Sequence, residues 1–158
     1  MTTKIDRAKI GGHITLVHKD KNGKELERRE VKNLVVDAGK ALVANLLIGV
    51  GDGFTALALG TGSAAATTAD TGLGTELTTG GFSRGEAAVS RVTTDAADDT
   101  AQLLLEFTSS SAGATVAVTE CGAFNAMSGV TLLGRQVFAA VNMANTDKLE
   151  VTYKFDVD

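Results

Sequence analysis

The sequence predicts a mainly β protein, an antiparallel β-sandwich or jelly-roll-like fold with one short α-helix and an N-terminal β-hairpin. Three observations support this class. Short apolar and β-branched runs recur between turn residues, 18 of the 158 residues are glycine, and the last run alternates between apolar and polar side chains. The length suits one domain that buries its own core. We therefore expect an N-terminal arm over residues 1–12 and a single domain over residues 13–158.

The arm is charged and lacks the apolar stretch of a secretory signal. Such a segment is either a frayed terminus or an arm that docks on a neighbouring subunit. In the second case, Ile5, Arg7 and Ile10 are the residues expected at the partner interface.

The domain is expected to open with the hairpin. An extended run from His13 leads to Asn22-Gly23, two positions that tolerate positive φ and so favour a tight turn. The return strand, to about Asn33, carries many charges and is expected to be solvated.

One helix is predicted from Asp37 to Ile48. Asp37 is expected to cap its first amides, and Gly49 supplies a stop. The residues expected to share its apolar face are Leu42, Val43, Leu46 and Leu47.

The remaining strands are expected over residues 55–60, 81–93, 101–108, 115–125, 131–141 and 148–157, with a long loop over 61–75. The last strand has the clearest pattern. Its predicted inward face is Leu149, Val151, Tyr153, Phe155 and Val157.

Charge and composition argue against several classes of protein. The formal net charge is −4, whereas domains that bind nucleic acid are usually basic. No apolar stretch approaches the roughly 18 residues of a membrane span. A single cysteine, Cys121, excludes an intrachain disulfide and suits a reducing cytosol. We therefore expect neither nucleic acid nor membrane as a partner.

We expect no catalytic residue, cofactor or metal site. On one strand, His13 and His18 would point to opposite faces. The run Asp95, Asp98 and Asp99 is better explained as a solvated turn than as a weak calcium site. Paired carboxylates would suit acid–base catalysis, but nothing in their spacing brings two together.

Three further residues or motifs have structural explanations. Cys121 lies in an apolar strand pattern and is expected to be a buried thiol rather than a nucleophile. Gly60-Thr-Gly62 resembles half of a phosphate loop but lacks the lysine that should follow, so a turn after a strand is favoured. Arg135 is expected to form a salt bridge with Glu120 or Glu76.

The order of several motifs resembles small virion structural proteins of tailed bacteriophages, found as head decoration (cement) proteins or as tail and fibre-associated proteins. The resemblance covers about Asn33 to Asp158. The motifs are Asn33-Leu-Val-Val-Asp-Ala-Gly39, Ala56-Leu-Ala-Leu-Gly-Thr-Gly62, Leu73-Gly-Thr-Glu-Leu77, Arg84, Thr119-Glu-Cys-Gly-Ala-Phe-Asn125 and Leu132-Leu-Gly-Arg135 with Phe138.

The resemblance implies a non-enzymatic capsid decoration protein that binds the outer shell between capsid subunits and stabilises it. Its expected partners are the major capsid protein and further copies of itself, as a dimer or trimer. Its expected location is the capsid surface of the virion, after synthesis in the host cytoplasm. The alternatives are a tail, baseplate or fibre protein that contacts the host surface, a glycan hydrolase carried on the virion, and a non-viral adhesion module.

Overall fold

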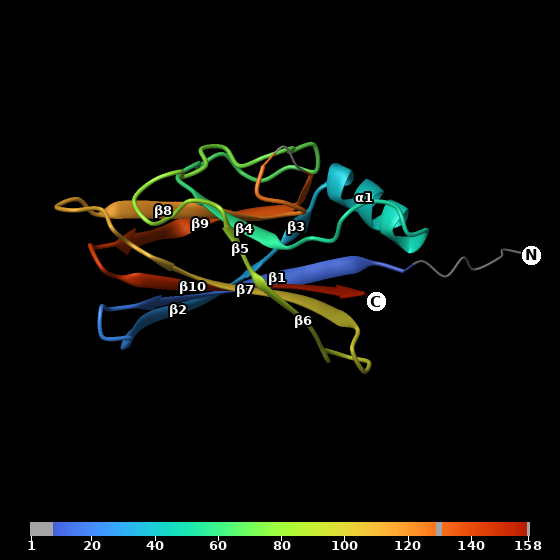
Figure 1. Ribbon diagram of the computed structural model, residues 1–158, viewed down its shortest axis with the longest axis horizontal. Coiled ribbons are helices and arrows are strands. Elements are labelled where there is room, and N and C mark those ends of the chain that lie inside the picture. The colour runs from blue at the N-terminus through green and yellow to red at the C-terminus, as the bar shows by residue number, and fades with distance from the viewer. Residues whose placement is uncertain (1–7, 129–130, 158) are drawn as a thin grey trace, which may run out of the picture.

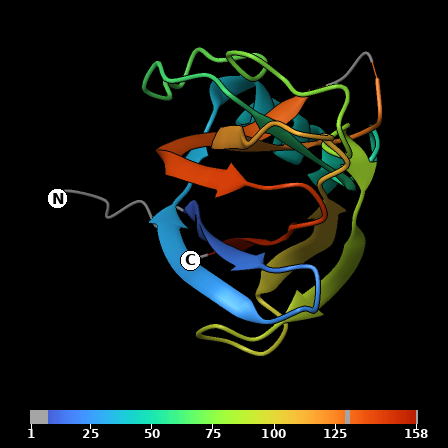
Figure 2. The same cartoon turned by 90° about the vertical axis from the view of Figure 1, so that its left-hand side faces the viewer.

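The structure, a computed structural model that describes residues 8–128 and 131–157, contains two five-stranded antiparallel sheets that face each other (Figures 1 and 2). The strand order is β2-β1-β10-β7-β6 in sheet A and β3-β9-β8-β4-β5 in sheet B. With one short helix and an N-terminal hairpin, this arrangement confirms the predicted mainly β class.

The strands of sheet A are β1 (Ile10–Lys19), β2 (Glu25–Lys32), β6 (Ala88–Val92), β7 (Thr100–Thr108) and β10 (Lys148–Val157). Those of sheet B are β3 (Leu34–Val35), β4 (Ala56–Gly60), β5 (Gly85–Glu86), β8 (Val116–Phe124) and β9 (Leu132–Met143). The helix α1 spans Asp37–Leu47.

The jelly-roll part of the prediction is not confirmed. A jelly roll is wound from two Greek keys across two sheets. Here β1 and β2 are neighbours in sheet A, and β8 and β9 are neighbours in sheet B, so each consecutive pair stays within one sheet. The strand predicted over residues 81–93 also divides, since β5 belongs to sheet B and β6 to sheet A.

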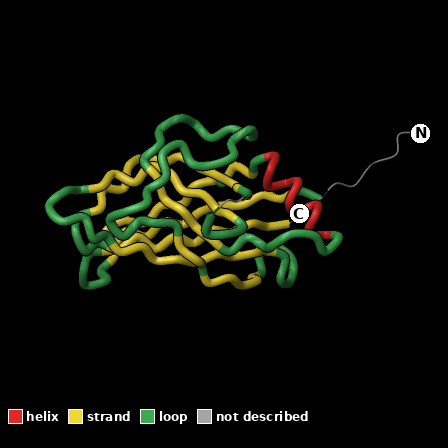
Figure 3. The backbone as a smooth tube through the Cα atoms, turned by 45° about the horizontal axis from the view of Figure 1, so that its top comes forward, coloured by secondary structure: helices red, strands yellow, loops and turns green. Residues whose placement is uncertain are grey.

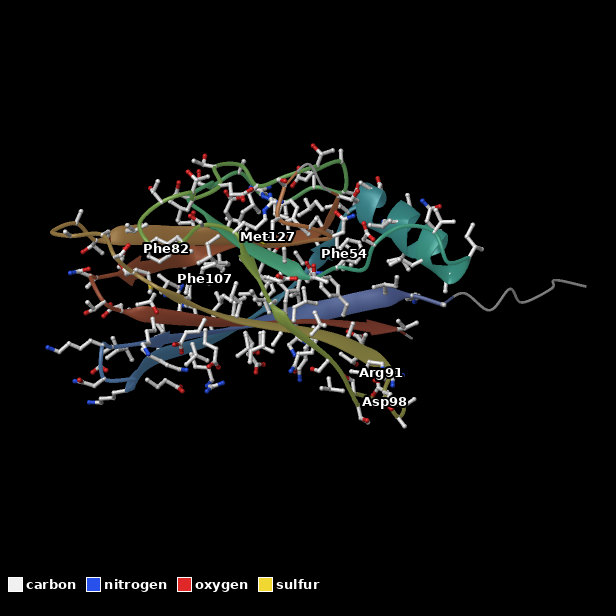
Figure 4. The ribbon with its side chains drawn as sticks, viewed as in Figure 1. Phe54, Phe82, Arg91, Asp98, Phe107 and Met127 are labelled. Carbon is white, nitrogen blue, oxygen red and sulfur yellow. The ribbon has the colours of Figure 1, made fainter. Side chains whose placement is uncertain are left out.

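The core lies between the two sheets. Buried side chains from both sheets form one cluster that includes Leu16 on β1, Leu59 on β4 and Phe107 on β7 (Figure 4). The predicted inward face of β10 is confirmed for Leu149, Val151, Tyr153 and Phe155. Val157 lies on the same face and lines an apolar pocket with Phe155, but it is 54% exposed because it ends the strand.

The hairpin forms with a different turn from the one expected. Gly23 has a φ of +82°, but Asn22 does not adopt a positive φ. Instead, the Asp20 carboxylate accepts the amide N–H groups of Asn22 at 2.8 Å and Lys24 at 3.0 Å. An aspartate side chain therefore holds the turn. The return strand β2 is largely exposed, as its charges predict.

Strand β1 begins inside the segment predicted as an arm. Residues 10–12 pair with residues 155–157 of β10. Gly12 permits this pairing because the backbone carbonyl of Lys154 occupies the place of a Cβ. Residues 1–7, with Ile5 and Arg7, lie outside the described residues.

The helix forms nearly as predicted, but its cap and its apolar face differ. Val36 is the N-cap residue and makes no side-chain cap bond, while Asp37 pairs with Lys40 at 3.0 Å. Leu47 is 83% exposed rather than packed, because it lies in the last turn, beyond the sheet. Gly39 lies against the backbone of Leu133, and this close approach explains a glycine inside the helix. No helix in the described residues has the length and apolar character needed to cross a membrane.

Candidate functional site

A long loop, residues 61–84, covers the outer face of sheet B and is called the covering loop (Figure 3). Its first half runs away from β4 and its second half returns beside the same strand. The Thr61 amide donates to the Thr75 carbonyl at 2.9 Å, and the Leu77 amide donates to the Leu59 carbonyl at 2.9 Å. Most of the loop lacks strand pairing, as predicted for residues 61–75. Contacts other than the hydrogen bonds between strands must therefore hold it in one conformation.

A β-bulge in β8 directs one carboxylate toward this loop. The register of β8 against β9 shifts between Val118 and Glu120. Val118 and Cys121 both join the core between the sheets, and Glu120 points to the opposite face. The bulge therefore places a charged residue outside the core without interrupting the apolar pattern around it.

Glu120 is fully buried beneath the covering loop and accepts hydrogen bonds from its backbone. Its Oε1 atom accepts the amides of Gly62 at 2.9 Å and Thr75 at 2.7 Å, and its Oε2 atom accepts the amide of Gly74 at 2.9 Å. One carboxylate thus joins the outgoing and returning halves of the loop. Bonds of this charge-assisted kind are stronger than those between neutral groups.

Arg135 on β9 completes the arrangement. Its Nε donates to Glu120 Oε2 at 2.8 Å, its Nη1 to Asp70 Oδ2 at 2.7 Å and its Nη2 to the Ala64 carbonyl at 3.0 Å. Only 3% of the Arg135 side chain is exposed. The predicted salt bridge is therefore confirmed with Glu120 as the partner. We call the group formed by Asp70, Glu120 and Arg135 the clamp.

The protonation states of the clamp follow from its contacts. Burial by itself would raise the pKa of Glu120, but the three amides and the Arg135 guanidinium together hold that pKa below its usual value. Burial also opposes ionisation of Asp70, yet the Thr67 amide and Arg135 lower its pKa. The two carboxylates outweigh the effect of burial on Arg135 and raise its pKa. All three groups are therefore charged at neutral pH.

A second ion pair anchors the end of the covering loop. Arg84 binds Glu76 through two bonds, Nε to Oε1 at 3.0 Å and Nη2 to Oε2 at 2.7 Å. Its guanidinium carbon lies 3.7 Å from the centroid of the Phe124 ring, and Nη1 donates to the Ala126 carbonyl at 3.2 Å. Glu76, the other partner proposed for Arg135, is thus engaged by Arg84.

The glycines near the clamp allow the backbone to approach the carboxylate. At Gly60 and Gly62, a Cβ would meet the Glu120 carboxylate. The Gly62 amide, which a phosphate loop would direct at a phosphate, donates to Glu120 instead. This confirms a structural role for Gly60-Thr-Gly62 and identifies the anion that it binds.

The clamp is suited to holding a surface in shape rather than to proton transfer. Both Glu120 oxygens are occupied by four donors, and no exposed edge of that carboxylate is left for a substrate. The clamp holds a loop of small residues in one conformation. The surface above it is an open depression of about 520 Å³, lined by loop residues such as Ala65, Ala69 and Leu73 and by the clamp residues Asp70 and Arg135.

Other residues singled out by the sequence lie apart from the clamp. Cys121 is buried in the core, which raises the pKa of its thiol, and this confirms the structural prediction. His18 Nε2 lies 2.8 Å from Asp147 Oδ2. His13 pairs across the sheet with Lys32 and Lys154. In the part of the chain that the structure describes, no three His, Cys, Asp or Glu side chains are grouped to hold a metal ion.

The acidic run forms a turn, as predicted. The Asp99 carboxylate accepts the amides of Ala96 at 2.7 Å, Thr94 at 2.8 Å and Asp95 at 2.9 Å, and these bonds lower its pKa strongly. Asp98 adopts a φ of +58° within this turn.

Ile10 is the one predicted interface residue that the structure describes. It lies at the start of β1, beside an apolar pocket at the α1 end of the molecule. Sequence patterns missed the part that Asp70 plays in the clamp, because an aspartate inside a loop of small residues carries no local sign of a partner 65 residues away.

Comparisons with protein-family models, curated proteins and solved structures found no match to this chain.

Proposed function

We propose that the protein is a non-enzymatic virion structural protein of a tailed bacteriophage, a decoration protein that binds the outer capsid shell between capsid subunits and stabilises it. The observation that carries the proposal is the position of the motifs behind the resemblance. Residues 56–62, 73–77, 119–125 and 132–135, together with Arg84, lie in the covering loop or in the strands and turn beside it, and they supply most of the residues of its two ion pairs.

A loop held in one conformation suits a protein whose function is to bind a partner. A surface that is ordered before binding loses less conformational entropy when it meets a partner. Glu120 and Arg135 supply that order from below, through hydrogen bonds to the backbone of the loop. Repeated copies on a symmetric shell multiply a modest contact energy.

The proposal assigns no catalytic role, cofactor or metal to this chain. Its partners are the major capsid protein and further copies of itself, and it acts at the capsid surface after synthesis in the host cytoplasm. A net charge of −4 supports solubility of the free subunit before assembly. Neither nucleic acid nor membrane is required as a partner.

Copy number tests this function directly. Phage particles whose genome encodes this chain are purified, and the chain is quantified by mass spectrometry against the major capsid protein. A simple stoichiometric ratio to the shell subunit, with hundreds of copies in each particle, is the expected result. A few copies to a few tens would indicate the tail, baseplate or fibre alternative. Absence from the particle would reject a virion role.

A further inference from the structure

One end of the molecule has an unusual concentration of exposed apolar side chains. The last turn of α1 and the residues after it carry Leu47, which is 83% exposed, Ile48, which is 76% exposed, and Val50, which is 53% exposed. Val157, 54% exposed, ends β10 at the same end of the molecule (Figure 1). Exposed apolar groups gathered in one place indicate a contact surface rather than chance.

An apolar pocket of about 240 Å³ lies at this end. Helix α1 contributes Val43 and Leu46, β10 contributes Phe155, and the segment before β4 contributes Phe54 (Figure 4). A cavity of about 150 Å³ with a similar lining can hold benzene, so this pocket has room for at least one aliphatic side chain. The apolar lining of the pocket favours a hydrocarbon side chain as its occupant.

The described chain begins at the edge of this pocket. Ile10 contributes to the lining and pairs with Val157, the last described residue of β10. Seven residues, Met-Thr-Thr-Lys-Ile-Asp-Arg, precede Ala8 and lie outside the described residues. Among them is Ile5, a large aliphatic residue five positions before Ile10.

The spacing favours the pocket of a second copy over the pocket of the same chain. To reach its own pocket, Ile5 would have to fold back over Ile10 within five residues. The connecting sequence Asp-Arg-Ala-Lys contains one residue that favours turns, Asp6, but no glycine, proline or asparagine, so its composition disfavours a tight reversal. In extended form, the same five residues reach about 17 Å, which is enough to leave one subunit and enter another.

An acidic turn at this end of the molecule is complementary in charge to the basic N-terminal segment. The turn that contains Asp95 and Asp98 is tied to β10 by the bond from the Val157 amide to the Asp99 carbonyl at 3.2 Å. Asp98 lies at the α1 end of the molecule (Figure 4). The N-terminal segment is basic around Ile5, with Lys4, Arg7 and Lys9 against Asp6. Opposite charges of this kind orient a docking segment.

We propose that the pocket receives Ile5 from the N-terminal segment of a second copy of this chain. The contact joins copies to one another, so it rests on the self-association included in the proposed function and identifies the surfaces that meet. If two copies each insert their N-terminal segment into the other's pocket, the result is a dimer. If each copy inserts its segment into the next copy around a three-fold axis, the result is a trimer.

Crosslinking between two single-cysteine variants tests this contact. Ile5→Cys protein is mixed with Leu47→Cys protein and treated with a short bismaleimide, while the native Cys121 stays buried and unreactive. The matched control replaces Leu47→Cys with Lys21→Cys, an exposed position in the hairpin turn at the other end of the molecule (Figure 1). The expected result is at least tenfold more heterodimer with Leu47→Cys than with Lys21→Cys. Equal yields would overturn the proposal.

The double variant Ile5→Cys/Leu47→Cys distinguishes the source of the segment. At high dilution, an internal crosslink in this variant would show that the pocket holds the chain's own segment, and the proposal would fail. In decorated particles, a crosslink from Leu47→Cys to the major capsid protein instead of to a second copy would also overturn it.

Sedimentation of the isolated protein gives a second readout. Ile5→Glu is expected to weaken self-association at least tenfold, whereas Thr2→Glu, with the same change in charge, is expected to leave it nearly unchanged. Equal effects would contradict a specific role for Ile5. Because these measurements use no capsid, their failure leaves the copy-number test of the decoration function unaffected.

Discussion

Glu120 and Arg135 form a buried ion pair on the outer face of sheet B, with Arg135 Nε donating to Glu120 Oε2 at 2.8 Å. Neither side chain is more than 3% exposed, although each carries a full charge. The pair is stable in that environment because the remaining polar atoms of both groups bind the covering loop. It therefore makes the conformation of the loop depend on two strands of the sheet.

Glu120→Gln is expected to destabilise the protein by about 3–5 kcal/mol, the usual cost of removing one partner of a buried ion pair. The Gln amide nitrogen would also face backbone N–H donors and leave at least one without an acceptor. Urea unfolding followed by circular dichroism measures the change. Glu106→Gln is the matched control, because Glu106 pairs with Lys19 at a more exposed position and is expected to cost less than about 1 kcal/mol. Similar losses in the two variants would contradict the role of the clamp.

Acid is expected to weaken the clamp. The pKa values of Glu120 and Asp70 are lowered by folding from ordinary values of 4.5 and 3.8. The unfolded chain therefore binds more protons than the folded chain in acid. The stabilisation is fully present above about pH 4.5 and is lost as the pH falls through the folded pKa values. Urea midpoints between neutral pH and pH 3 should fall less steeply for Glu120→Gln than for the natural sequence. Parallel slopes would show that Glu120 does not carry this dependence.

Arg84→Lys is expected to cost about 1–2 kcal/mol, although it preserves the charge. Lysine cannot form the two parallel bonds to Glu76, and it stacks less well on Phe124 than a planar guanidinium. Arg28→Lys is the control, since Arg28 also binds Glu25 through two bonds but with about half of each side chain exposed. Thermal unfolding of both variants should show a clear loss only for Arg84→Lys.

Gly62→Ala is expected to lose about 1–3 kcal/mol, because the new methyl group would meet the Glu120 carboxylate. Gly72→Ala lies in the same loop with nothing within 4 Å of the added methyl, and it should be neutral or slightly stabilising. Calorimetric melting temperatures compare the two. A loss of the same size for Gly72→Ala would contradict this explanation, because alanine would then destabilise the loop at a position where it does not contact Glu120.

Truncation locates the border between the arm and the domain. Removal of residues 1–12 is expected to lower the melting temperature relative to removal of residues 1–7, because it deletes the pairing of residues 10–12 with β10. Differential scanning calorimetry on the two truncated proteins measures the difference. Equal melting temperatures would show that this part of β1 contributes little and would support the boundary predicted at residue 12.

The sequence was sufficient for the fold class and for most strands. Periodicity records burial directly, so the alternation from Leu149 to Phe155 identified the inward face of β10. The same logic predicted a buried Cys121. It failed for Leu47, because helical spacing shows which residues share a face but not how far the neighbouring sheet extends.

The clamp could be anticipated only in part. Charged residues among small and apolar strand residues were enough to name Glu120 and Glu76 as the two alternative partners of Arg135, but not to choose between them. Local patterns gave no sign of the bulge after Val118 or of the part played by Asp70.

The sequence by itself determined most of the strands, the helix and the list of charges that required partners, because these depend on local periodicity and residue chemistry. Only the tertiary structure decided that Glu120 binds three amides of the covering loop, that Glu76 belongs to Arg84, and that Ile10 lies beside an apolar pocket. These contacts join residues that are far apart along the chain, and their distances are set by how the two sheets, the loop and the helix pack.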